Sequence, residues 1–228
     1  QQQFDAVFLA AGLGGVNALG LEDEQAFGVE DAVEYIAELR QTEHRETLSV
    51  GHNIIVIGGG MTAIDIAVQS KLLGAQNVTI VYRRDQQAMP ASEFEQNLAQ
   101  THNVSIKFEA APIRLFTQDG ALHAVEFEKM QQTDSGINGT GETFRLTADR
   151  VFKAIGQTLV EQDLGNQLRP QIENGRIVVD EQRRTTLDGV WAGGDCVIGG
   201  NNLTVSAVQD GKLAAISIDR MLRIEEDA

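Results

Sequence analysis

The clearest hydrophobic pattern in the chain predicts one βαβ unit. The continuous apolar run at residues 53–57 is typical of a parallel strand that is buried on both faces. Glycines 58–60 follow it, and apolar residues then recur at helical spacing over 64–72, until Gly74 marks the helix C-terminus. The β-branched run at 78–82 predicts a second strand, which completes the length of a βαβ unit.

Further elements lie on both sides of this unit. Residues 29–40 have helical spacing, which predicts a helix followed by a polar linker over 41–51. Downstream, Ser92 and Glu95 form a capping-box pattern at the start of a second helix, and alternating residues at 104–108 predict another strand. Helices and strands therefore alternate, as in an α/β fold.

A two-residue period of apolar positions marks residues 111–150. Alternating apolar residues flank Asp119-Gly120, a dipeptide that favours a hairpin turn. The stretch 134–142 is rich in Gly, Thr and Ser and predicts a second turn, before a returning strand at 144–146. The pattern predicts an antiparallel β-meander within the α/β unit.

An eight-residue motif occurs twice. Residues 5–12 and 149–156 both read Asp-x-Val-Phe-x-Ala-x-Gly, and they bracket the βαβ unit. Chance can produce such a match among apolar positions, but the bracketing favours a shared structural role. The chain closes with a strand-like segment at 189–195 and a helix. The apolar row of that helix consists of Val205, Val208, Ala215, Ile218 and Leu222.

The glycine turn after the first βαβ strand matches a dinucleotide-binding fingerprint, Gly58-x-Gly60-x-x-Ala63. Gly58 permits a tight turn, Gly60 lets the backbone approach a pyrophosphate, and Ala63 allows close packing of helix and strand. The helix N-terminus supplies free N–H groups for the phosphates. A purely structural turn is the alternative, but the strand–turn–helix context favours nucleotide binding.

Two arginines follow the second strand of the unit, where an NAD-binding protein usually carries an acidic residue for the ribose. Arg83 and Arg84 occupy this place, and the first acid is Asp85. Guanidinium groups pair bidentately with phosphate, so the pattern favours NADPH, with its 2′-phosphate, over NADH. The alternative is a solvated basic corner that binds no ligand.

A third signal lies near the C-terminus. Gly194 and Asp195 precede a helix that starts near Thr204. A carboxylate at a strand end can accept hydrogen bonds from sugar-like hydroxyls, and a helix N-terminus stabilises negative charge on a reduced ring system. Taken without the other motifs, this segment is simply a polar turn.

Composition excludes several other functions. The chain has 18 Lys and Arg against 33 Asp and Glu, and its net charge of −15 disfavours binding to nucleic acids and anionic membranes. The single cysteine, Cys196, precludes an internal disulfide and a cysteine-based metal site, and the four histidines share no ligand spacing. No apolar run reaches the length of a membrane span and no signal peptide opens the chain, so we expect a cytoplasmic protein without a metal site.

Together these motifs resemble the two-dinucleotide-binding flavoproteins. More narrowly, the chain is similar to the small subunit of glutamate synthase and to the electron-input module of dihydropyrimidine dehydrogenase. The resemblance covers nearly the whole chain. The segments that carry it, in a specific order, are residues 4–9, 58–65, 74–84, 89–90, 190–195 and 207–212.

The resemblance implies a Rossmann-like three-layer α/β domain for NAD(P)H, with an antiparallel meander, inserted in an incomplete FAD-binding domain. Residues 1–50 would then be the end of the first FAD-domain segment plus a linker helix. Residues 51–148 would be the NAD(P)H-binding domain, and residues 149–228 the C-terminal FAD-domain segment. No catalytic side chain is implied. The implied cofactor-binding residues are Gly58, Gly60, Met61, Thr62, Ala63, Asp65, Arg83, Arg84, Gly156, Gly194, Asp195, Thr204 and Val205.

The same resemblance implies individual roles. Thr62 joins the pyrophosphate site, and Asp65 lies near the nicotinamide. Asp195 binds the ribityl–phosphate part of FAD, and the helix start at 204–205 faces the isoalloxazine. Met61 departs from the family, which usually has a polar residue at this position.

The family's first FAD fingerprint and its N-terminal iron–sulfur cysteines do not occur in this sequence, which begins at Gln1 close to a strand. We therefore expect a C-terminal part of such a subunit, which alone is inactive and does not retain FAD. In the parent protein, electrons would pass from NADPH to FAD and on to an iron–sulfur partner that reduces an imine or a pyrimidine ring. The alternatives are a nucleotide-binding redox sensor without turnover and an interaction scaffold with vestigial motifs.

Overall fold

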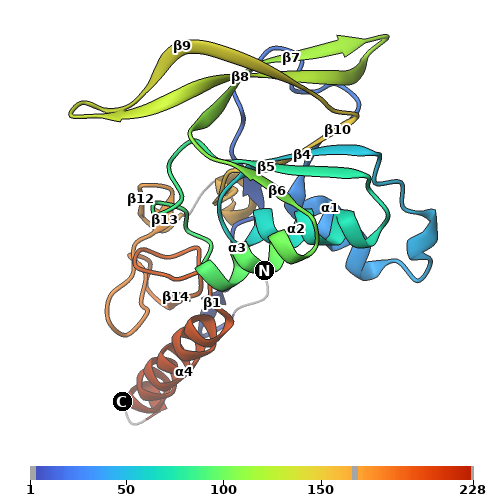
Figure 1. Cartoon of the computed structure of the whole chain (residues 1–228). Helices are drawn as coiled ribbons and strands as arrows, with labels where there is room; N and C mark the ends of the chain where they lie inside the picture. Colours follow the sequence, from blue (N-terminus) through green and yellow to red (C-terminus); the bar gives the residue numbers. More distant parts are fainter. Residues whose placement is uncertain (1–3, 166–168, 227–228) are drawn as a thin grey trace. The chain divides into compact units, whose positions relative to one another are not determined.

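The computed structural model describes residues 4–165 and 169–226 (Figure 1). Two compact units divide the chain. Unit 1 comprises Gln1–Gly15 and Gln157–Ala228, and unit 2 comprises Val16–Gly156. The residues of unit 2 therefore lie between the two segments of unit 1 in the sequence.

Unit 2 is built around a five-stranded parallel sheet with the strand order β3-β10-β4-β5-β6. β4, which was predicted from its continuous apolar run, is the central strand. Its sequence is apolar throughout because both of its faces are covered. The strand bounds are β3 Val29–Asp31, β4 Asn53–Gly58, β5 Asn77–Val81, β6 Ser105–Lys107 and β10 Arg150–Ala154.

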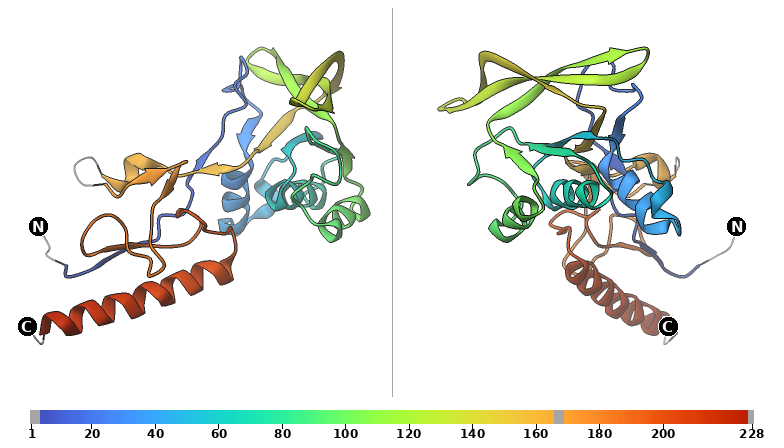
Figure 2. Two further views of the ribbon diagram at one scale, coloured as in Figure 1. Left: turned by 90° about the vertical axis from the view of Figure 1, so that its left-hand side faces the viewer. Right: turned by 45° about the vertical axis from the view of Figure 1, so that its right-hand side comes forward.

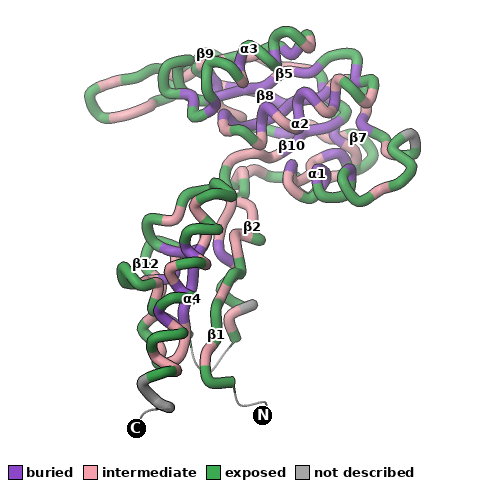
Figure 3. Tube along the Cα trace, turned by 90° about the horizontal axis from the view of Figure 1, so that it is seen from below, coloured by how far each residue is buried: buried purple, intermediate pink, exposed green. Residues whose placement is uncertain are grey.

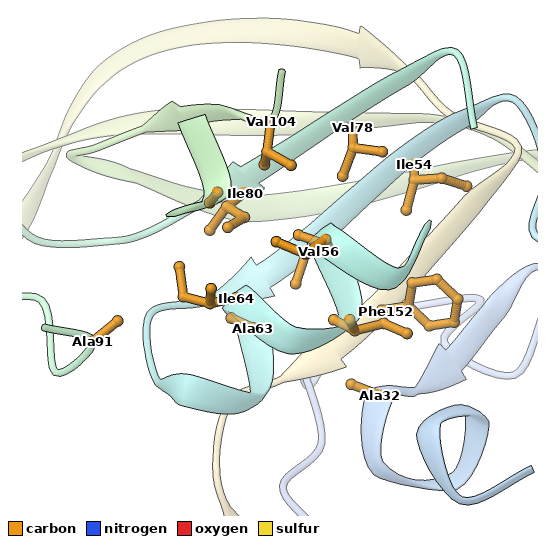
Figure 4. Packing of buried hydrophobic residues seen from close by; sticks show 14 of the residues in the cluster. Ala32, Ile54, Val56, Ala63, Ile64, Val78, Ile80, Ala91, Val104 and Phe152 are labelled. Atoms are coloured by element: carbon orange, nitrogen blue, oxygen red, sulfur yellow. The ribbon is translucent and has the colours of Figure 1, made fainter. Parts of the chain in front are cut away.

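Helices cover one face of this sheet, and a meander covers the other (Figure 2). The helices are α1 Ala32–Gln41, α2 Met61–Leu72 and α3 Glu93–Thr101. Alternate residues of β4 point into two different cores. Ile54 and Val56 pack with the helices (Figure 4), whereas Ile55 and Ile57 pack with the meander. The predicted three-layer α/β fold is thus confirmed.

The predicted meander is present, but its second turn is much shorter than expected. Asp119 and Gly120 connect the first two strands with positive φ angles of 53° and 80°, as the hairpin motif predicts. The predicted turn at 134–142 is wrong in extent, because only Asp134 and Ser135 separate the second strand from the third. The strands are β7 Ala110–Gln118, β8 Ala121–Thr133 and β9 Gly136–Thr147.

Glu128 explains why this glycine-rich segment is a strand. Its carboxylate accepts a hydrogen bond of 2.8 Å from the amide of Gly141, and it fills the space where a Cβ atom on Gly139 would stand. The register of the β8–β9 pair shifts at this point, between Glu128 and Met130. The glycines therefore make room for a side chain beside an irregularity in the hairpin.

A second difference concerns the start of α1. Helical spacing predicted a helix from Val29, but Val29–Asp31 form β3, and the helix begins at Ala32. Val29 pairs with Val151 of β10, which lies far along the chain. The long-range strand pairing determines the conformation here, and a local pattern cannot reveal it.

A partly buried charge cluster fixes the loop that precedes β3. Lys153 of β10 forms ion pairs of 3.0 Å with both Glu24 and Asp31. Glu24 also accepts hydrogen bonds from the backbone amides of Leu19 and Gly20. Burial opposes the negative charge of Glu24, but these donors together hold its pKa below the ordinary value. Burial likewise opposes the charge of Lys153, whose pKa its two carboxylate partners nevertheless raise.

We expect Glu24→Gln to destabilise the chain by about 1–2 kcal/mol at pH 7, because a neutral amide pairs less strongly with Lys153. Because folding lowers the pKa of Glu24, its stabilisation is present above the unfolded pKa and is lost as the pH falls through the folded one. The difference between variant and unmutated chain should therefore shrink below about pH 4. Urea unfolding at both pH values measures this, with the exposed Glu22→Gln as control. If Glu24→Gln lowered the free energy of unfolding equally at the two pH values, this prediction would be contradicted.

Unit 1 contains a two-stranded parallel sheet and a long helix. β1 Val7–Leu9 pairs with β14 Val190–Ala192, and α4 spans Thr204–Glu226. Val205 and Val208 of the predicted apolar row are exposed, whereas Asp210, Ala214 and Ser217 are the buried residues in the part of α4 whose burial is described. Most of α4 is exposed or half-buried (Figure 3). Small side chains let the helix pack closely, so its packed face differs from the predicted one. The remaining short elements of the whole chain, in either unit, are β2 Gly15–Val16, β11 Gln157–Thr158, β12 Ile172–Glu173, β13 Arg176–Ile177, and the 3₁₀ turns η1 Arg45–Thr47 and η2 Glu161–Leu164.

The repeated octet supplies one parallel strand to each unit. Residues 5–12 contain β1, and residues 149–156 contain β10, which pairs with β3 and β4. Because β3, α1 and β10 all pack in unit 2, the predicted domain boundaries after residues 50 and 148 fall inside that unit.

Candidate dinucleotide-binding site

The turn between β4 and α2 has the shape that a dinucleotide fingerprint requires. Gly58 has a φ of 145°, and a Cβ atom there would lie 2.2 Å from the carbonyl oxygen of Ala154. Only glycine fits this position without strain. In contrast, nothing lies within 4 Å of a Cβ atom built on Gly60. The turn is thus closed toward β10 and open at the residue where a pyrophosphate would approach the backbone.

The N-terminus of α2 is available to bind an anion. Gly60 is the N-cap residue, and no side chain caps the first turn. Met61 is 47% exposed, Thr62 is half-buried, and Ala63 is fully buried in the core between helices and sheet. The first-turn N–H groups and the positive end of the helix dipole therefore fit the phosphates of a dinucleotide.

Two exposed arginines follow β5. Within the part of the chain that the structure describes, neither Arg83 nor Arg84 forms an ion pair. The carbonyl of Arg84 accepts a hydrogen bond from the amide of Glu109, which fixes the backbone and leaves both guanidinium groups free for a phosphate. Because β4 and β5 are parallel, these arginines and the glycine turn lie at the same edge of the sheet.

Two other predicted residues of unit 2 already have protein partners. Asp65 forms an ion pair of 3.1 Å with Arg40 of α1, so its carboxylate lies beside the neighbouring helix. Gly156 follows β10 with a φ of 99°, and its carbonyl accepts a hydrogen bond from the amide of Asn17. The predicted place of Asp65 near a nicotinamide and the cofactor role of Gly156 stay predictions.

The four predicted residues of unit 1 lie at the end of β14 and at the start of α4. Gly194 and Asp195 follow the strand after Gly193, and Thr204 and Val205 are exposed in the first turn of the helix. Asp195 is half-buried, and its Oδ1 atom lies 3.7 Å from the place of a Cβ atom on Gly12, just beyond β1. A carboxylate at the ends of two parallel strands can accept hydrogen bonds from ligand hydroxyls.

An ion pair between the buried Asp210 and the half-buried Arg183, which the sequence analysis missed, holds this turn. The Asp210 carboxylate of α4 contacts Arg183 at 2.6 Å and accepts a hydrogen bond of 2.9 Å from the amide of Gly194. Arg183 has a positive φ of 65°, and its carbonyl accepts a hydrogen bond from the amide of Ala192. The one signal in the sequence was the place of Asp210 within the family-like segment 207–212.

We expect Asp210→Asn to lower the free energy of unfolding by about 2 kcal/mol, because the half-buried Arg183 loses its charged partner. The amide oxygen can still accept the hydrogen bond from Gly194. Asp219→Asn is a matched control on the same helix, since Asp219 pairs with Arg223 in solvent, and it should cost less than about 0.5 kcal/mol. Urea unfolding of both variants measures the difference, and equal losses would overturn the expectation.

Cys196 is a structural thiol. It is buried, its thiol donates a hydrogen bond to the carbonyl of Gly193, and burial raises its pKa. Because the thiolate is the reactive form, these properties make the side chain inert. The sequence has no second cysteine, so this chain cannot form a redox-active pair of thiols.

The described residues contain neither a membrane-spanning helix nor a cluster of metal ligands. No helix in residues 4–165 and 169–226 is both long and apolar enough to cross a membrane. No three His, Cys, Asp or Glu side chains in these ranges gather as ligands for a metal ion.

The parallel sheet, the glycine turn and the uncapped helix N-terminus define unit 2 as a Rossmann-type fold. The chain as a whole belongs to the pyridine nucleotide-disulphide oxidoreductase family, whose model matches residues 1–211. This family consists of oxidoreductases, and membership implies a fold that binds FAD and a pyridine nucleotide.

Relatives with known names agree with the predicted resemblance. The chain is 34% identical to the NADP(+)-dependent formate dehydrogenase subunit beta of Moorella thermoacetica, over 98% of its length and 32% of that protein. It is 30% identical to the glutamate synthase [NADPH] small chain of Escherichia coli, over 97% of its length and 51% of the relative. The NAD-dependent dihydropyrimidine dehydrogenase subunit PreT of Escherichia coli is 33% identical, over 95% of this chain and 47% of that one.

The chain thus spans about a third to about half of the length of these relatives. Among solved structures, the thioredoxin reductase of Lactococcus lactis matches with a TM-score of 0.74 and 24% identity, over 94% of this chain and 65% of that one. The structural likeness supports the fold. The predicted resemblance to glutamate synthase small subunits and dihydropyrimidine dehydrogenase is confirmed.

Proposed function

We propose that this chain is the electron-input part of a flavoprotein that oxidises NADPH. Unit 2 binds the coenzyme as an NAD(P)H domain, and unit 1 contributes residues to a flavin site. Electrons pass on to an iron–sulfur partner domain or subunit. The observation that carries the proposal is the open space at Gly60, at the same sheet edge as Arg83 and Arg84, which form no ion pair with any described residue.

The names of the relatives support this choice of coenzyme and partner. The formate dehydrogenase relative is named NADP(+)-dependent, and the glutamate synthase relative carries NADPH in its name. Each of the three relatives is a subunit or small chain of a larger enzyme. The dihydropyrimidine dehydrogenase subunit is named NAD-dependent, so the coenzyme has to be tested directly.

Each part of the site has one task in this proposal. Gly58 keeps the turn tight, Gly60 admits the pyrophosphate, and the N-terminus of α2 binds the phosphate oxygens. Arg83 and Arg84 pair with the 2′-phosphate. No side-chain acid or base is required, because the bound nicotinamide and flavin supply the hydride chemistry and the protein aligns them.

Oxidation of NADPH by the whole protein, with ferricyanide as artificial electron acceptor, tests the proposal. A far higher kcat/KM with NADPH than with NADH supports it. Tight binding of NADPH without oxidation would instead identify a redox sensor. Failure to bind either coenzyme would identify an interaction scaffold with vestigial motifs.

A further inference from the structure

Gly59 is the residue of the glycine turn to which the fingerprint gives no role. Its φ is not positive, so the backbone conformation alone does not require glycine. However, a Cβ atom at this position would lie 2.4 Å from Cδ2 and 2.6 Å from Cε2 of Tyr82. The ring of Tyr82 therefore rests directly on the Gly59 backbone, in space that any other residue would occupy.

Tyr82 also holds the loop that carries Arg83 and Arg84. Its hydroxyl donates a hydrogen bond of 2.8 Å to the carbonyl of Ala88, across the base of the loop. The residue itself is only 9% exposed, and its amide donates to the carbonyl of Lys107. The two arginines thus leave the sheet from a fixed starting point.

The far end of the loop is attached to the same glycine. The amide of Ala91 donates a hydrogen bond of 2.9 Å to the carbonyl of Gly59, and the carbonyl of Ala91 accepts one from the buried side chain of Gln96. Within the loop, Asp85 Oδ1 accepts a hydrogen bond of 2.8 Å from the amide of Ala88. The loop therefore begins and ends against Gly59.

We propose that Tyr82 is a positioning residue that couples the pyrophosphate-binding turn to the two arginines, and that Gly59 makes this contact possible. The inference rests on the proposed function. A loop anchored at both ends restricts the backbones of Arg83 and Arg84 before any ligand arrives, so less conformational entropy is lost on binding. Tyr82 thereby contributes to selectivity for NADPH over NADH through the arginines.

Tyr82→Phe tests the hydrogen bond to Ala88, because it keeps the ring on Gly59. We expect the dissociation constant of NADPH to rise about five- to tenfold, and that of NADH by less than about twofold. Tyr35→Phe is the matched control, since Tyr35 is the other tyrosine of the chain and donates to the carbonyl of Ser49. It should leave the ratio of the two affinities unchanged.

A double-mutant cycle tests the contact with Gly59. Gly59→Ala places a methyl group against the ring of Tyr82. It should lower the affinities for both coenzymes by about tenfold, because the turn itself must shift. Tyr82→Leu removes the ring, so in a chain that carries Tyr82→Leu the substitution Gly59→Ala should lower the affinity for NADPH much less. Additive effects on the affinity for NADPH would mean that the contact does not couple the two sites.

The outcomes separate this inference from the proposed function. If the unmutated chain binds neither coenzyme in calorimetric titration, the proposed function fails. If it binds NADPH selectively, but Tyr82→Phe retains the full selectivity or the cycle is additive, the inference alone is overturned. Loss of selectivity in Tyr82→Phe but not in Tyr35→Phe, together with a non-additive cycle, establishes the coupling.

Discussion

Alanine at both Arg83 and Arg84 is expected to weaken NADPH binding by about ten- to a hundredfold and to leave NADH binding nearly unchanged. A charge-assisted hydrogen-bonded pair with the 2′-phosphate contributes about 1.5–3 kcal/mol, and about 1.4 kcal/mol corresponds to a factor of ten in affinity. NADH lacks this phosphate, so it loses only a general electrostatic attraction. Isothermal titration of both coenzymes against both proteins measures the effect.

The charge-matched control replaces Arg114 and Arg145 by alanine. Both are exposed arginines of the meander in the same unit, beside Phe116. The net charge of −15 repels both coenzymes, and NADPH more strongly, so loss of any two positive charges should weaken binding at low salt. Only the loss of affinity for NADPH that is caused by replacing Arg83 and Arg84 should persist at physiological salt. Equal affinities for both coenzymes in the unmutated chain would make these arginines solvated residues and NADH the electron donor.

Elements with local signals could be predicted from the sequence. The capping box at Ser92 is present with both of its hydrogen bonds, and β4 and β5 coincide with their apolar runs. The strand Val29–Asp31 could not be predicted, because it exists through pairing with β10 and its apolar spacing is also compatible with a helix. The glycines of β9 were misleading for the same reason, since the side chain that needs their space belongs to another strand.

The residues of the candidate site likewise divide into those with a local sequence signal and those that depend on distant partners. Gly58 and Gly60 are recognisable because the fingerprint is continuous in sequence and lies between a strand and a helix. Asp210 could not be predicted, because its partners Arg183 and Gly194 come from two separate segments. The role of Tyr82 depends on the approach of its ring to Gly59, which no spacing in the sequence encodes. Residues that bind a ligand are thus more visible in the sequence than residues that hold the binding loops.

The two glycines of the fingerprint are expected to respond to alanine in opposite ways. Gly58→Ala should destabilise the fold by at least about 3 kcal/mol, because a positive φ combines with a 2.2 Å contact to the carbonyl of Ala154. Gly60→Ala should change the free energy of unfolding by less than about 1 kcal/mol, since its φ of −92° is allowed and nothing lies within 4 Å. Urea unfolding of both variants measures this contrast.

The open space at Gly60 should matter for coenzyme binding, so Gly60→Ala should lower the affinity for coenzyme. The new methyl group occupies the place at which a pyrophosphate approaches the backbone, so the affinities for NADPH and NADH should both fall by at least about tenfold. Both coenzymes share the pyrophosphate, and this common loss distinguishes Gly60→Ala from the arginine variant, which affects NADPH alone. Calorimetric titration of the folded Gly60→Ala chain decides the matter. Unchanged affinity for both would mean that the pyrophosphate binds away from this turn, and Arg83 and Arg84 would then lose their expected ligand as well.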